Sequence, residues 1–135
     1  MAAPIHHSDV LIAVMGAPHR SDMVTSVIRM TQALLERGAR VQIWTCGDAT
    51  GLTSALLGDS KPRNVVDWAQ DHPSTAAIVL GLIEDYPDHL DWYVCRFCSE
   101  ERGMSEQISQ VRKRPPFTFW KHTKAAEKTL CLGVC

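Results

Sequence analysis

Apolar and polar residues follow one another along this chain in blocks that have the lengths of strands and helices. The continuous apolar run Val10–Met15 is typical of a buried strand, and Val41–Cys46 is the second predicted strand. Between them, from about Met23 to Arg37, apolar residues recur near the helical period, and Gly38 follows as a helix stop. The first 46 residues therefore predict a strand, a helix and a strand at the spacing of a right-handed, parallel βαβ unit.

The pattern after residue 46 is less regular, but the alternation of strands and helices continues. It predicts a short helix at 52–57, a short helix at 64–69, a helix at 75–85, a strand at 90–94, a helical segment at 104–111, a short strand at 117–119, a helix at 120–128 and a terminal strand at 129–134. Two adjacent prolines exclude a helix interior at 112–116, which we expect to be a connection. We predict a single domain, residues 1–135, of the α/β class: a three-layer sandwich with a mainly parallel sheet of about five strands.

The composition and charge of the chain argue against several classes of function. The chain is 45% hydrophobic and 21% charged with a net charge of −1, which is typical of a soluble globular protein and argues against a general nucleic-acid-binding protein. The apolar runs are too short to span a bilayer, and the N-terminal residues lack the pattern of a signal peptide. We therefore expect a cytoplasmic protein. In a reducing compartment, its five cysteines favour metal, redox or catalytic use over structural disulfides.

The most informative motif is Cys95-Arg96-Phe97-Cys98, at the point where the predicted third strand passes into a helix-compatible segment. A thiol at this junction lies near the positive end of a helix dipole, which favours the nucleophilic thiolate. Cys95 and Cys98 are therefore the candidate catalytic residues. Arg96 and Arg102, on the same segment, are candidates to stabilise the anion.

Functional residues of parallel α/β sheets gather beyond the carboxyl ends of the strands. His19, in the first strand-to-helix turn, is a further candidate for substrate binding, and Cys46 ends the second strand, where a core role is the expectation. A zinc site would need ligands beyond the CxxC pair, from Cys46, Cys131, Cys135 or a histidine, and a second paired motif is missing. We therefore predict neither a metal nor a cofactor.

Three landmarks in this order give the chain a resemblance to a known family. They are Leu11–Val14 followed by a helix that ends near Gly38, an apolar strand that ends in Cys95 ahead of Arg102-Gly103, and Phe117–Phe119 followed by a helix and a final apolar strand. In this arrangement the chain resembles the DsrE-like sulfur-relay proteins, and the resemblance extends over nearly its whole length. The segment between Cys46 and Leu90 fits this pattern least well.

The resemblance implies a DsrE-like fold and a function as sulfur carrier or sulfurtransferase subunit. It assigns to Cys95 the position that holds sulfur as a persulfide, whereas Cys98 goes beyond the minimal pattern because a single cysteine suffices for relay. It also implies sulfur-donor and sulfur-acceptor proteins as partners, and a homo- or hetero-oligomer, commonly a trimer or hexamer. We expect no membrane and no direct nucleic-acid partner.

Two alternatives from other classes remain open at this point. The first is a non-catalytic interaction subunit of the same fold, in which the cysteines are only structural. The second is a thiol–disulfide redox protein, because CxxC at a helix start is the spacing of such enzymes and Cys98 would resolve a mixed disulfide on Cys95. In redox proteins of this type the motif follows the first strand of the domain, whereas here it follows the third predicted strand.

Overall fold

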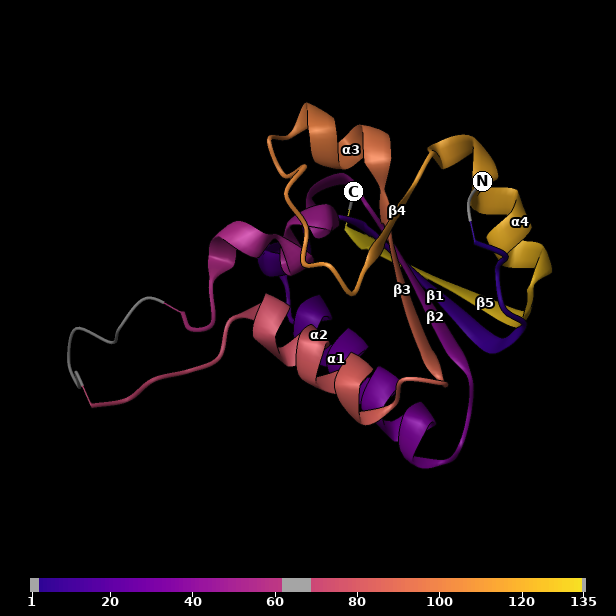
Figure 1. Ribbon diagram of the computed structural model, residues 1–135, viewed down its shortest axis with the longest axis horizontal. Coiled ribbons are helices and arrows are strands. Elements are labelled where there is room, and N and C mark those ends of the chain that lie inside the picture. Colours follow the sequence, from indigo (N-terminus) through magenta and orange to yellow (C-terminus); the bar gives the residue numbers. More distant parts are fainter. Residues whose placement is uncertain (1–2, 62–68, 135) are drawn as a thin grey trace.

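A five-stranded, parallel sheet forms the centre of the molecule (Figure 1), which we describe from a computed structural model for residues 3–61 and 69–134. The spatial order is β4-β3-β2-β1-β5, and each neighbouring pair is parallel. The strands are β1 (Ser8–Gly16), β2 (Val41–Cys46), β3 (Leu90–Cys95), β4 (Arg112–Arg114) and β5 (Ala126–Val134). This sheet confirms the predicted α/β class and strand number.

Helices connect the strands. They are α1 (Met23–Glu36), α2 (Thr75–Asp85), α3 (Arg96–Glu101) and α4 (Phe119–Lys124), with 3-10 segments η1 (Pro18–Arg20), η2 (Gly47–Thr53), η3 (Ala55–Leu57) and η4 (Pro116–Thr118). Within the described ranges, no helix is long and apolar enough to cross a membrane. The helix predicted at 23–37 and its glycine stop are confirmed: α1 ends at Glu36 and Gly38 adopts a φ of 82°.

The two faces of the sheet carry different clusters because side chains alternate along a strand. One face presents residues such as Ile12, Ile43 and Trp92 to α1 and α2, which form one outer layer (Figure 1). The other face presents Trp44 and its neighbours to the short α4, which lies on the opposite side of the sheet. The molecule is thus a three-layer sandwich in which one outer layer is thin.

The prediction of a helix at 104–111 is wrong. This segment contains no helix, and its polar groups bond instead to η2. The side-chain Nε2 of Gln107 donates to the carbonyl oxygen of Thr50 at 2.9 Å, and the backbone N–H of Ile108 donates to the carbonyl of Thr53 at 3.1 Å. Because backbone groups of this segment bond to a distant part of the chain, it forms an isolated bridge and turns instead of a helix.

The fourth strand lies earlier in the chain than predicted. Arg112–Arg114, expected to be a solvated connection, pairs with β3 as β4, whereas 117–119 joins η4 and the start of α4. A charged strand is suited to the edge of a sheet, where charges discourage further pairing, and the side chains of β4 are half-buried there. The α4 helix is also shorter than the predicted 120–128, because β5 begins at Ala126.

Two other predictions fall in the less regular middle of the chain. The segment 52–57, expected to be a short helix, is helical but of the 3-10 type, split between η2 and η3. The short helix predicted at 64–69 lies outside the described residues except for its last position. The helix at 75–85 is confirmed, with Ser74 as N-cap accepting a hydrogen bond from the N–H of Ala77 at 3.1 Å.

Candidate functional site

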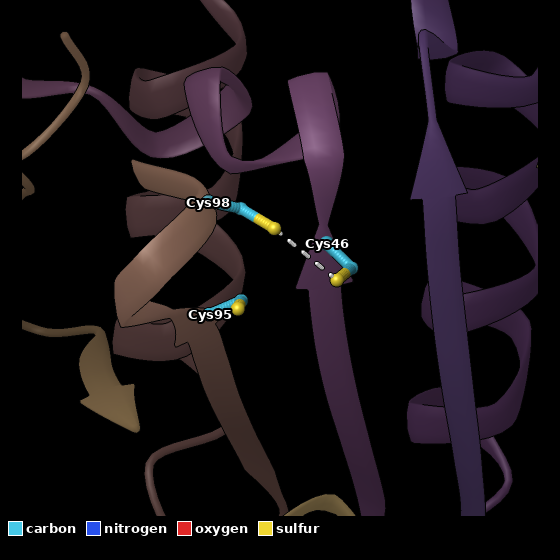
Figure 2. Close-up of side chains that lie close together, drawn as sticks. All are labelled: Cys46, Cys95 and Cys98. Atoms are coloured by element: carbon cyan, nitrogen blue, oxygen red, sulfur yellow. Dashed lines mark hydrogen bonds between the residues drawn. The ribbon is translucent and has the colours of Figure 1, made fainter. Parts of the chain in front are cut away.

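Three cysteines from two separate segments meet at the carboxyl ends of the central strands (Figure 2). Thr45 of β2 pairs with Val94 of β3, so the next residue of each strand, Cys46 and Cys95, lies on the same face at the same edge. The first turn of α3 then brings Cys98 over this edge, and the Sγ atoms of Cys46 and Cys98 lie 3.5 Å apart. All three sulfur atoms lie within 4.8 Å of one another, and we call this group the three-cysteine cluster.

Cys98 is the one thiol of the three whose pKa is lowered, and it is more accessible to solvent than Cys95. It is half-buried, whereas Cys95 is 0% exposed. Burial alone would raise the pKa of Cys98, but the backbone N–H of Gly47, the thiols of Cys46 and Cys95 and the positive charge of Arg102 outweigh it and lower that pKa. The thiolate of the cluster therefore forms first on Cys98.

The other two thiols remain protonated around it. The pKa of Cys46 is raised to about 12. Burial is the largest cause, followed by the hydrogen bond to Cys98 and by the charges of the two neighbouring sulfurs. Burial is also the main cause that raises the pKa of Cys95, although the backbone N–H of Cys98 partly offsets it. When Cys98 ionises, its partly exposed thiolate thus lies against two thiols that can donate hydrogen bonds to it.

The η2 loop positions the N–H group that supports the Cys98 thiolate. Gly47 has a φ of 65°, a conformation that residues with a Cβ rarely adopt. A Cβ at this position would also lie 3.2 Å from the backbone nitrogen and 3.3 Å from the Cα of Gly16, the last residue of β1. Both the turn and the close approach of the two strand ends require glycine here.

Gly47→Ala is expected to destabilise the fold by about 1–3 kcal/mol and to slow the alkylation of Cys98, because relief of the clash moves the N–H that bonds to this sulfur. Gly38→Ala is the control, since Gly38 also has a positive φ, of 82°, but open space around its missing Cβ. Urea unfolding should show a larger loss for Gly47→Ala than for Gly38→Ala. Equal losses, with Cys98 reactivity unchanged, would contradict the argument.

A cleft of about 870 Å³ opens at the same carboxyl edge. Its lining includes His19 from η1 and Arg102 from the end of α3, so the structure brings these two predicted substrate-binding residues to one cleft. Arg102 donates through Nε to Oδ1 of Asp48 at 2.8 Å, and this pair joins α3 to η2. The third predicted residue, Arg96, is exposed at the start of α3 and is not among the residues that line this cleft.

Sequence reasoning understated Cys46, for which a core role was expected. The position of Cys46 in the sequence could have indicated its role. Cys46 and Cys95 each end a predicted strand, and the carboxyl ends of adjacent parallel strands lie side by side. Of the remaining cysteines, Cys131 is exposed on β5, away from the cluster, and Cys135 lies outside the described residues.

Comparison with known proteins supports the fold. No protein-family model matches this chain, and no curated protein matches it. Among solved structures, the crystal structure of the ychN protein from E. coli is similar, with a TM-score of 0.71 over 92% of this chain and 98% of that chain, at 20% sequence identity. At this level of identity the likeness shows the fold alone, and that fold is the DsrE-like arrangement predicted from the sequence.

Proposed function

We propose that this protein is a sulfur carrier that accepts sulfane sulfur as a persulfide in the three-cysteine cluster and passes it to a partner protein. The observation that supports this best is the combination of a partly exposed Cys98 with a lowered pKa and a buried Cys95 directly beneath it. A carrier needs a nucleophilic thiol that a donor can reach, and a protected place for the sulfur afterwards.

The first step uses Cys98. Its thiolate attacks the terminal sulfur of a donor persulfide, R–S–SH: a new S–S bond forms on Cys98 as the donor's S–S bond breaks, and the donor leaves as the thiolate R–S⁻ while the proton stays on the transferred sulfur. The neighbouring N–H of Gly47 and the guanidinium of Arg102 stabilise the negative charge before the attack. No oxidant is needed, because the transferred sulfur keeps its oxidation state.

The second step brings the sulfur to Cys95, the carrier position that the DsrE-like resemblance implies. With Sγ atoms within 4.8 Å of one another, the Cys95 sulfur attacks the outer sulfur of the Cys98 persulfide, and Cys98 returns to a thiol as Cys95 becomes the persulfide. Because Cys95 is 0% exposed, the persulfide is protected from solvent there. Reversal of this step returns the sulfur to Cys98, from which an acceptor thiol takes it.

Donor and acceptor proteins are proposed to dock on the exposed surface of α3. Phe97 lies between the two cysteines of the motif and is 55% exposed, so it offers an aromatic contact to a docked partner right beside the cluster. Arg96 beside it is also exposed and suits an acidic partner surface. We further propose that the protein acts in the cytoplasm as a homo- or hetero-oligomer, as the DsrE-like resemblance implies.

Mass spectrometry after incubation with a persulfide-generating cysteine desulfurase and cysteine tests this proposal. Wild type is expected to gain about 32 Da, one sulfur atom, on a peptide of the cluster, in a form that dithiothreitol removes. Cys98→Ser should lose loading by at least about tenfold, because the reachable thiolate is gone. In Cys95→Ser the sulfur should load but stay on Cys98, and Cys131→Ser, outside the cluster, should behave as wild type.

The same experiment separates the competing functions. A loss of 2 Da with release of sulfide would favour a dithiol redox protein, and the 3.5 Å Sγ–Sγ distance indicates that its disulfide would join Cys46 to Cys98 rather than the two cysteines of the CxxC motif. No modification of wild type with any persulfide donor would contradict the carrier proposal and leave the interaction subunit as the better account. Loading of Cys98→Ser at the wild-type rate would contradict the assigned order of steps.

A further inference from the structure

The three-cysteine cluster has a second chemical capacity that does not depend on sulfur transfer. Cys46, Cys95 and Cys98 form the only group of three or more histidine, cysteine or acidic side chains that converges on one point within residues 3–61 and 69–134. The thiols come from two segments that the sheet holds in fixed register, so they are placed together before any ligand binds. A preformed group of donors reduces the cost of ordering a site around a metal ion.

The spacing of the sulfurs suits a single small cation. Around one metal ion at a metal–sulfur distance of about 2.3 Å, three sulfurs lie about 4 Å from one another. In the cluster, Cys46 and Cys98 are already 3.5 Å apart and all three sulfurs lie within 4.8 Å. Small rotations of the side chains of Cys95 and Cys98 therefore suffice to bring the sulfurs around one ion.

The donor set selects the kind of metal. Three thiolates are soft ligands, which favour Cu(I) and Zn²⁺ over Mg²⁺, Ca²⁺ or Mn²⁺. Structural zinc sites are almost always tetrahedral with four ligands, whereas the cluster supplies three ligands among the described residues. Cu(I), which is stable with three sulfur ligands, matches the cluster better than Zn²⁺.

The surroundings support a negatively charged metal–thiolate centre. The backbone N–H groups of Gly47 and Cys98 favour negative charge on the sulfurs of Cys98 and Cys95, respectively. Outer-shell groups of this kind orient and support metal ligands. Arg102 adds positive charge next to Cys98, and the half-buried Cys46 and Cys98 give an ion a way in from solvent.

We propose that Cys46, Cys95 and Cys98 form a binding site for one Cu(I) ion, coordinated by the three Sγ atoms. Binding displaces the thiol protons and changes the oxidation state of neither copper nor sulfur. This goes beyond the proposed sulfur transfer and uses the same thiols, so a protein that holds Cu(I) has no free Cys98 to accept sulfur. The cluster would then be blocked when thiophilic metal is in excess.

Anaerobic titration of the reduced protein with Cu(I), in competition with a chromophoric Cu(I) chelator, tests the site. Wild type is expected to retain one equivalent of Cu(I). Cys46→Ser and Cys98→Ser should each weaken the affinity by at least about 100-fold, because each removes one of three ligands. Both positions are only half-buried, so these variants should fold, which circular dichroism checks. Cys131→Ser, whose thiol is exposed and outside the cluster, should bind as wild type does.

X-ray absorption at the copper edge gives the second readout, with three sulfur neighbours at about 2.3 Å expected. Complete removal of copper by the competitor, equal affinity of Cys98→Ser and Cys131→Ser, or a two-sulfur coordination shell would each overturn the three-thiol site. The titration contains no persulfide donor. Failure of copper binding therefore leaves the sulfur-carrier proposal standing, and failure of sulfur loading leaves the copper site standing.

Discussion

Iodoacetamide is expected to alkylate Cys98 at least about tenfold faster than Cys95 at pH 7.5, because only the thiolate reacts and because Cys95 is 0% exposed. The pH at which the Cys98 rate is half-maximal should lie below that of the same cysteine in the urea-unfolded chain, since the folded structure lowers its pKa. Peptide mass spectrometry at timed intervals, from pH 5 to pH 10, gives both rates separately.

Two arginines of the motif region provide matched variants for this pH profile. Arg102→Gln should move the Cys98 midpoint to higher pH, because the Arg102 charge is one of the causes that lower the pKa of this thiol. Arg96→Gln should leave the midpoint where it is, since Arg96 is exposed and is not among those causes. Equal shifts in both variants, or a Cys95 that reacts as fast as Cys98, would contradict the proposed order of reactivity.

The sequence was sufficient to place the CxxC motif at a strand-to-helix junction, but not to rank its two thiols. Helix-dipole reasoning applies equally to Cys95 and Cys98 at the start of α3. The two thiols differ in their tertiary environment. Cys95 still belongs to strand β3 and lies in the hydrophobic cluster with Trp44 and Tyr93, whereas Cys98 lies near Gly47 and Arg102. Burial and long-range hydrogen bonds of this kind have no local sequence signal.

The fold was predictable where local pattern and tertiary packing agree, as in α1 and in the buried β1, β2 and β3. It was not predictable between residues 104 and 114, where the chain bonds to η2 and to the edge of β3. Strand β4 is the clearest example. Its Arg-Lys-Arg sequence has low strand preference, and it forms a strand only because the edge of β3 offers unpaired backbone groups.

A buried polar network around Gln42 of β2 was also missed, because its partners Ser8 and His122 come from distant segments of the chain. The side-chain nitrogen of Gln42 donates to Oγ of Ser8 at 2.8 Å and to the carbonyl of His122 at 3.3 Å. Its side-chain oxygen is therefore left to accept from Nδ1–H of His122, at 3.1 Å. This arrangement assigns the Nδ1–H tautomer to His122, whose ring is 0% exposed and packed against the rings of Trp44 and Tyr93.

The protein is expected to lose on the order of 3 kcal/mol of stability as the pH falls from about 6.5 to about 4, through His122 alone. Burial, together with the positive charge of Arg114, lowers the pKa of His122 to about 4, whereas in the unfolded chain it titrates near 6.5. Between these values the unfolded state binds a proton that the folded state does not, so the contribution is fully present above pH 6.5 and is lost as the pH approaches 4. Urea unfolding at pH 7, 6, 5 and 4 measures this loss.

The variant His122→Asn isolates the contribution of the ring from that of the carboxylates, which titrate at similar pH. An asparagine amide can still donate to the side-chain oxygen of Gln42 but does not titrate, so the variant should be less stable than wild type at pH 7 and show a weaker pH dependence below 6.5. His19→Asn replaces an exposed histidine and should keep the wild-type profile. If the pH profiles of His122→Asn and wild type were parallel, His122 would not be held neutral in the folded state, and the buried network would contribute packing without a pH-dependent term.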